Sequence, residues 1–183
     1  MINSRPTPVA AENTCMTDRI APSLAALTDL ERTLHAEIPL TRAMDVRVLR
    51  ADQNGLALGA ALAPNLNHKQ TAFGGSLNSL ATLACWGLMQ LLVRDMGQAI
   101  TVVVQESSVQ YLKPVTRDFE ALCSLPPAPV IEKFLRTLER KGRARLALAA
   151  TIHAEGDIAL RFRGQFVAYD RVRFQGFEPP AVV

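Results

Sequence analysis

Residues 77–93 read LNSLATLACWGLMQLLV, a stretch that is apolar on nearly every side when it is wound into a helix. A helix of this kind is buried on most of its surface. Its length approaches that of a membrane span, but polar side chains interrupt it and strand-like sequence flanks it. The interruptions are Asn78, Ser79, Thr82 and Gln90. We therefore predict a helix at the centre of a soluble domain and no membrane span.

The segments on both sides of this stretch have the alternation and the β-branched residues that are typical of strands. The turns ADQNG and EGD separate two pairs of these segments and predict two hairpins, with Gly164 as a candidate bulge in the second. The expected strands cover residues 42–50, 56–63, 99–112, 118–125, 144–154 and 158–169.

Two amphipathic helices are predicted beside these strands. The first covers residues 24–38, where leucines recur at helical spacing between a capping Ser23 and Pro39, which stops the pattern. The second covers residues 130–142, after the helix-breaking run PPAP. Two helices and six strands accompany the apolar helix.

Hairpins around one apolar helix predict an α+β domain, an antiparallel sheet of about six strands wrapped around the long helix. This arrangement is the hot-dog fold. Such a sheet keeps exposed edges, and pairing edge strands across a two-fold axis would cover them. We therefore expect a homodimer or a higher oligomer.

The 183 residues predict one domain, over residues 23–170, between a disordered leader at 1–22 and a tail at 171–183. The leader has no apolar segment behind a basic start, so we expect a cytoplasmic protein. Cys15, Cys85 and Cys123 lack metal-ligand spacing, and we expect buried or incidental thiols. A net charge of +3 excludes no class of partner.

Gly74 and Gly75 fall directly before the apolar helix. The N–H groups at a helix start point outward, with the positive end of the helix dipole behind them. Glycine also lets a ligand carbonyl approach the backbone closely. The pair therefore predicts an oxyanion site; the alternative is a tight turn that needs two glycines.

The segment NHKQTAFGGSLNSLATLACW resembles the entry loop and central helix of hot-dog thioesterases. Together with QYLKPV, FLRTLERKGRARLAL and GQFVAY, it is similar to the thioesterase-like family that also occurs fused behind an acetyltransferase domain. The resemblance spans residues 38–169 in separated blocks, and members of this group are linked to decarboxylation of malonyl carrier protein.

The resemblance implies roles for residues of this segment. Asn67 would contact the thioester region, with a loop-capping amide as the alternative, and the N–H of Gly74 would polarise the carbonyl. Phe73 stands where many relatives have His, so one polar contact is lost. Thr82 stands where hydrolytic relatives carry Asp or Glu. We expect substrate contacts from Phe73, Gly75, Asn78, Ser107 and Ser108.

Hydrolysis needs a base, and a threonine hydroxyl is far too weak a base to replace a carboxylate. Glu106 and His68 are the nearest substitutes, but an exposed strand carboxylate and a surface histidine are the simpler interpretations. Decarboxylation of a malonyl thioester needs only fixed donors for an enolate, which Asn67, Gly74 and Thr82 could provide. We therefore expect a decarboxylase that uses no cofactor or metal. The alternatives are an acyl thioesterase and a non-catalytic module that binds acyl thioesters.

The thioester would be carried by coenzyme A or by an acyl carrier protein, both anionic where the pantetheine arm emerges. The densest basic cluster spans residues 136–145, and we expect phosphopantetheine or carrier contacts from Arg140, Arg143 and Lys113. A solvated face is the alternative. No aromatic side chains interleave with this cluster, which argues against a nucleic-acid partner.

Overall fold

The computed structural model describes residues 22–97 and 99–174, so the predicted leader lies almost wholly outside the described residues, as does the tail beyond Phe174. The helices are α2 (Leu24–Glu37), α3 (Pro39–Ala43), α4 (Gly74–Val93) and α5 (Ala128–Lys141), with short 3-10 turns η1 (Ala63–Asn65) and η2 (Arg94–Met96). The strands are β1 (Val46–Asp52), β2 (Gly55–Ala60), β3 (Ile100–Tyr111), β4 (Phe119–Ser124), β5 (Arg143–Ala154) and β6 (Asp157–Asp170).

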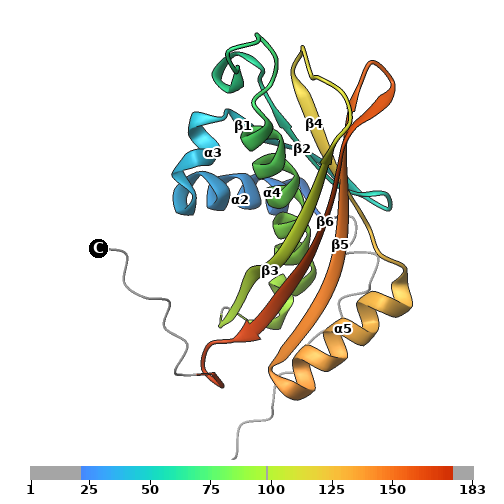
Figure 1. Cartoon of the computed structure of the whole chain (residues 1–183). Helices are drawn as coiled ribbons and strands as arrows, with labels where there is room; N and C mark the ends of the chain where they lie inside the picture. Colours follow the sequence, from blue (N-terminus) through green and yellow to red (C-terminus); the bar gives the residue numbers. More distant parts are fainter. Residues whose placement is uncertain (1–21, 98, 175–183) are drawn as a thin grey trace, which may run out of the picture.

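The six strands form one antiparallel sheet in the order β1-β2-β4-β5-β6-β3, and the sheet curves around α4 (Figure 1). This confirms the predicted α+β hot-dog fold. Helix α4 with η2 is long and apolar enough to cross a membrane, but 67% of its most apolar window is buried inside the protein. Its apolar surface is therefore largely covered by the sheet.

The N-terminal helices differ from the prediction at one point. Ser23 caps α2 as expected, its hydroxyl accepting a hydrogen bond from the N–H of Ala26 at 3.3 Å. Pro39 ends α2 but also begins α3, because a proline is tolerated in the first turn of a helix, where its missing N–H is not needed. The buried hydroxyl of Thr41 donates to the carbonyls of Leu34 and Ile38, which fixes the corner between the two helices.

The predicted bulge at Gly164 is wrong. Gly164 pairs in regular register with Leu148 on β5 and Ser107 on β3. A Cβ at this position would lie 2.8 Å from a ring carbon of Phe166 and 2.9 Å from one of Phe162, so the glycine is needed for packing. The register shifts on these strands lie elsewhere, between Val104 and Glu106 of β3 and, within the second hairpin, opposite Ile152 and His153 of β5.

Helix α5 covers a part of β5 that has no strand beside it. β4 pairs with β5 only between Ala121–Cys123 and Ala150–Ile152, which leaves the first half of β5 unpaired on that side. The apolar face of α5 packs near this half and is buried through Ile131, Phe134 and Leu138. The apolar face of α5 therefore covers the part of the core that β4 leaves open.

Strand β3 is an edge of the sheet, and most of its side chains are exposed. Near its start, the indole N–H of Trp86 on α4 donates to the carbonyl of Val102 at 3.1 Å, so the helix satisfies this carbonyl of the edge strand. Val103 and Val104 remain 38% and 44% exposed. An edge strand with exposed apolar side chains is a surface that another chain can pair with.

Candidate active site

The glycine pair opens α4: Gly74 and Gly75 are its first two residues, so the helix begins three residues before the predicted start at Leu77. The first N–H with an acceptor in this turn is that of Leu77, which donates to the carbonyl of Phe73 at 3.1 Å. Within the described residues, the N–H groups of Gly74, Gly75 and Ser76 have no hydrogen-bond acceptor. Three free donors therefore stand at the positive end of a 20-residue helix.

Two aromatic rings flank this turn. A Cβ on Gly74 would lie 3.3 Å from the ring of Tyr111, and a Cβ on Gly75 would lie 2.2 Å from the ring of Phe73. Both rings are more than half exposed. The phenol of Tyr111 also donates to the carbonyl of Gly74 at 3.0 Å. The donors therefore lie between two exposed aromatic rings, of which that of Tyr111 is held to the backbone by its hydroxyl.

Asn67 holds its own loop together. Its amide nitrogen donates to the hydroxyl of Thr71 at 2.9 Å and to the carbonyl of Ala72 at 3.2 Å. Its amide oxygen accepts from the N–H groups of Lys69 and Thr71. These contacts favour the loop-capping alternative, and a direct contact with substrate stays a prediction. His68 is exposed in the same loop.

Half-buried polar residues continue along α4 from the glycine pair. Thr82 lies two turns from Gly74, about 12 Å along the axis at 1.5 Å per residue, and its hydroxyl donates to the carbonyl of Asn78 at 2.9 Å. The single hydrogen of this hydroxyl is therefore engaged, which leaves its lone pairs for a ligand. The side-chain oxygen of Asn78 is buried without a hydrogen-bond partner in the described chain.

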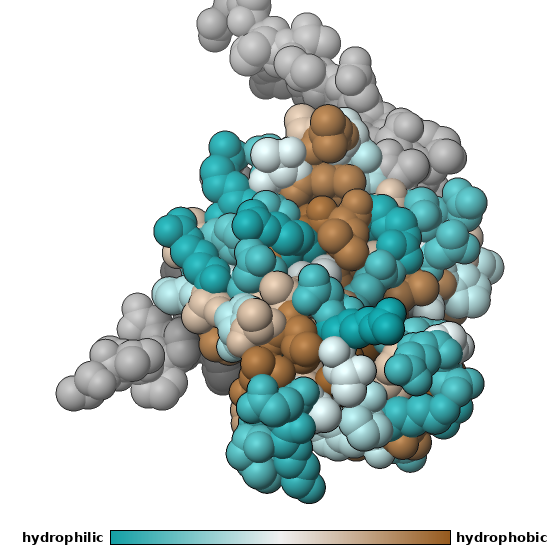
Figure 2. Space-filling view, turned by 90° about the horizontal axis from the view of Figure 1, so that it is seen from above, coloured by the Kyte–Doolittle hydropathy of each residue, from teal (hydrophilic) through white to brown (hydrophobic). Residues whose placement is uncertain are grey.

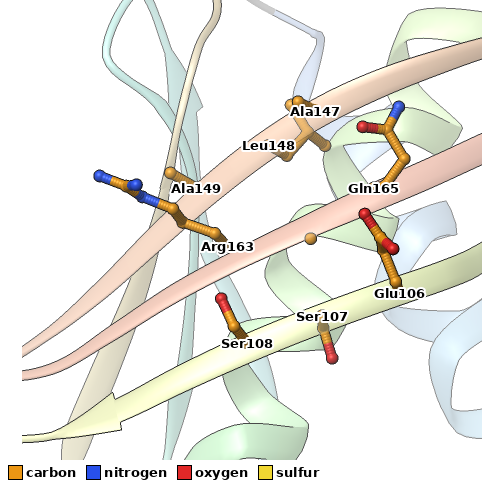
Figure 3. Close-up of a pocket in the computed structure, with 9 residues that line it drawn as sticks. Glu106, Ser107, Ser108, Ala147, Leu148, Ala149, Arg163 and Gln165 are labelled. Carbon is orange, nitrogen blue, oxygen red and sulfur yellow. The ribbon is translucent and has the colours of Figure 1, made fainter.

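The bulge in β3 decides which of its residues face α4. Ser107 pairs with Gly164, whose missing side chain would point at the core rings, so Ser107 faces the helix side. Glu106 and Ser108 face the outer side, where they line a hollow that Figure 3 shows. The two serines, both expected to contact substrate, therefore lie on opposite faces of the sheet, and only Ser107 is on the face of the glycine turn. Glu106 is likewise on the wrong face of the sheet to serve the glycine turn.

The predicted basic contacts do not form one group. Arg143 pairs with Tyr169 at the start of the β5–β6 hairpin, whereas Lys113 pairs with Asp157 at its other end. Eleven residues of strand separate these ends, about 36 Å at 3.3 Å per residue. Lys113 lies at the end of the domain that carries the glycine turn, and its ammonium holds the pKa of the Asp157 carboxyl below its usual value. Arg140 lies beside Arg143 at the far end.

The end of the domain around the glycine turn is apolar at its surface. Figure 2 looks onto this end and shows a band of hydrophobic side chains between hydrophilic ones. Within residues 22–97 and 99–174, no three His, Cys, Asp or Glu side chains come together that could hold a metal ion. The exposed apolar residues next to the turn in the chain or in contact with it are Leu66, Phe73, Tyr111 and Leu112.

Tyr111 is the residue of this site that sequence reasoning did not single out. Its ring and hydroxyl both contact Gly74. Tyr111 stands 37 positions away in the chain, and no local spacing links the two. The contact depends on how β3 pairs in the sheet, which local sequence patterns do not reveal.

Comparisons with known proteins agree over the whole domain. Residues 27–170 match the family described as "Putative thioesterase (yiiD_Cterm)". A solved structure from Chlorobaculum tepidum, of unknown function, is 32% identical over 83% of this chain and 98% of its own, with a TM-score of 0.76. A "putative thioesterase" from Shewanella oneidensis is 27% identical over 79% of this chain and 98% of its own, with a TM-score of 0.71. A thioesterase from Haemophilus influenzae, 11% identical over 82% and 95% of the two chains, shares the fold with a TM-score of 0.63.

Proposed function

Because the chain belongs to the thioesterase family of the YiiD C-terminal domain, we propose that it acts on acyl thioesters at the start of α4 and decarboxylates a malonyl thioester there. The observation that carries this proposal is the chemistry of the turn. Three free N–H donors stand at Gly74–Ser76, while α4 contains no carboxylate. Hydrogen-bond donors alone can stabilise an enolate, whereas an attacking water also needs a base to remove its proton.

The reaction breaks the bond between the substrate carboxylate and its neighbouring carbon. The electron pair of that bond moves into the thioester and forms an enolate, and CO2 leaves. The enolate oxygen accepts hydrogen bonds from the N–H groups at the helix start, which are already oriented and need no rearrangement. A proton from solvent then joins the carbon and gives the acetyl thioester.

The surroundings of the turn support this chemistry. The rings of Phe73 and Tyr111 flank the donors, and an acyl group bound against them would displace water, which strengthens each hydrogen bond to a developing charge. Thr82 and the buried, unpartnered oxygen of Asn78 lie further along the same helix. Asn67 acts by holding the loop that places Phe73.

Thioester hydrolysis is the second candidate, and the family description favours it. Hydrolysis would require a base from outside α4, because this helix contains no carboxylate. Glu106 does not supply that base, since it lies on the outer face of the sheet. A second copy is one source of such a group. The exposed valines on the free edge of β3 support a homodimer formed along this strand.

Product analysis separates these functions. The full chain is incubated with malonyl carrier protein and with malonyl-coenzyme A, and the products are identified by mass. Acetyl thioester is the expected product. Malonate with free thiol would replace the proposal with hydrolysis, and unchanged substrate would favour a binding module. Gly75→Ala, which places a methyl group beside the donors, should lower the rate with both substrates.

A further inference from the structure

The outer face of the sheet carries a hollow of about 580 Å³ over strands β5, β6 and β3. Its floor is formed by small side chains, Ala147 and Ala149, and Arg163 stands over it (Figure 3). Ser108 and Glu106 form the opposite rim on β3. A shallow surface with a methyl floor and a charged rim suits a partner of complementary shape and charge.

Two arginines on β6 contribute positive charge to this face. Arg161 and Arg163 are two positions apart on one strand, and both are exposed because Phe162 between them faces the core. In the described part of the chain, neither forms an ion pair or a hydrogen bond with another side chain. Both guanidinium groups therefore keep all their donors for an external anion, and bidentate contacts with carboxylates are what arginine favours.

Glu106 is the opposing charge on this face and lies on the far side of the hollow. It does not neutralise Arg163 in the folded chain, since no ion pair joins them within the described residues. An acidic partner would therefore contact the β6 side and avoid the Glu106 side. The charge distribution fixes one orientation of the partner.

The position of this face relates it to the glycine turn. Arg161 pairs in register with Gln110, the residue before Tyr111, whose hydroxyl contacts Gly74. Arg161 lies on the outer face of the sheet and the turn on the helix face, but neighbouring strands lie about 4.8 Å apart, so only the edge strand β3 separates Arg161 from the rim around which the turn is reached. The exposed Tyr111 and Leu112 lie at the end of β3 between them. A flexible thioester arm attached to a partner over Arg161 would pass this end to reach the donors.

We propose that the Arg161–Arg163 face docks the acidic surface of the acyl carrier protein that delivers the thioester. This inference rests on the proposed function and adds the partner and its orientation. It also moves the carrier contact from Arg140 and Arg143, at the far end of the domain, to the end that holds the turn.

The test uses the charge-reversed variant Arg161→Glu/Arg163→Glu in the full chain. Its matched control is Lys133→Glu/Arg136→Glu on the exposed side of α5. Each protein is assayed with malonyl carrier protein, malonyl-coenzyme A and malonyl-pantetheine. We expect kcat/KM for the carrier substrate to fall at least about tenfold in the β6 variant, mainly through KM. The rate with malonyl-pantetheine and the rates of the α5 control should stay within about twofold.

Three outcomes would overturn the docking proposal. One is an equal loss with malonyl-pantetheine, which would mean that the variant disturbs the site itself. A second is an equal loss with malonyl-coenzyme A and the carrier substrate, which would assign the arginines to nucleotide phosphates. The third is an unchanged rate with the carrier substrate. Arg161→Lys/Arg163→Lys keeps the charge but not the bidentate geometry, so it should lower kcat/KM for the carrier substrate less than charge reversal does.

Direct binding separates this proposal from the proposed function. If no thioester reacts with the unchanged protein, the enzymatic proposal fails, and docking is still measured by titrating the carrier protein against the full chain. Binding that weakens in the β6 variant and with added salt would support docking. Absence of binding, or equal binding by the β6 variant, would overturn it.

Discussion

The phenol of Tyr111, the last residue of edge strand β3, donates a hydrogen bond of 3.0 Å to the carbonyl of Gly74, the first residue of α4. This contact joins the end of the sheet to the helix start that carries the free N–H donors. It also explains the glycine, because a Cβ at Gly74 would lie 3.3 Å from the Tyr111 ring. The geometry of the site therefore depends on the register of β3.

Removal of this hydroxyl should affect the reaction more than the fold. A net hydrogen bond contributes about 0.5–1.5 kcal/mol, and Tyr111 is 53% exposed. We expect Tyr111→Phe to lower kcat about two- to tenfold, with little change in thermal stability. Steady-state kinetics and calorimetry on the same sample measure both. An unchanged kcat would show that the ring alone positions the turn.

Gly75→Ala should separate stability from activity. Alanine is the better helix former, by about 1 kcal/mol, so the melting temperature should stay the same or rise. Its Cβ would meet the ring of Phe73, which must swing away. The methyl group then crowds the donors, and we expect kcat/KM to fall about ten- to a hundredfold.

The control is the same change in a Phe73→Ala background, where the ring that must move is absent. If displacement of the ring causes the loss, Gly75→Ala should have a smaller effect in this background. An equal loss in both backgrounds would assign it to the methyl group alone.

Thr82→Asp should introduce hydrolysis. The substitution places a carboxylate on the half-buried face of α4, two turns from the donors, where it can accept a proton from water. We expect free thiol and malonate to appear beside the acetyl thioester, quantified by mass. Thr82→Val removes the hydroxyl without adding a base and should yield no malonate. Malonate from the unchanged protein, or none from Thr82→Asp, would contradict this account of the site.

Burial should make Cys85 unreactive. Removal from water, with a smaller effect from neighbouring Cys123, raises the pKa of the Cys85 thiol well above its ordinary value. In a Cys15→Ala background, we expect slow modification by thiol reagents in the folded protein and fast modification after unfolding. Rapid modification of the folded protein would contradict the packing between α4 and β4.

The same shift predicts how stability depends on pH. An unfolded cysteine ionises at about pH 8.5, whereas Cys85 in the folded protein stays protonated at that pH. The contribution of the protonated Cys85 thiol to the free energy of unfolding is therefore complete below that pH and is lost as the pH rises above it. The melting temperature should fall between about pH 8 and pH 10, and fall less steeply in Cys85→Ala.

Much of the fold follows from local pattern. Helix α4 was predictable because a segment that is apolar on nearly all sides must be surrounded, and the hairpins around it form a sheet that can surround it. The glycine pair was predictable because a helix start leaves its N–H groups free whatever packs around it. These features need no knowledge of distant contacts.

The faces of β3 were not predictable, because one inserted residue reverses them. Strict alternation from the inward-facing Val102 and Val104 would place Glu106 inward and Tyr111 outward. The bulge at Gln105 shifts the register, so Ser107 and Tyr111 face the helix instead. No glycine marks this bulge in the sequence; Gly164, which suggested one, serves to leave room for two rings.

The most direct test of the central claim is one reaction with a malonyl thioester in deuterium oxide enriched in heavy oxygen. Decarboxylation through an enolate predicts an acetyl thioester that carries one deuterium on its methyl carbon, with no heavy oxygen in the acyl group. Hydrolysis would instead release malonate that contains heavy oxygen. Malonate so labelled, without deuterated acetyl thioester, would contradict the proposal that the Gly74–Ser76 turn stabilises an enolate.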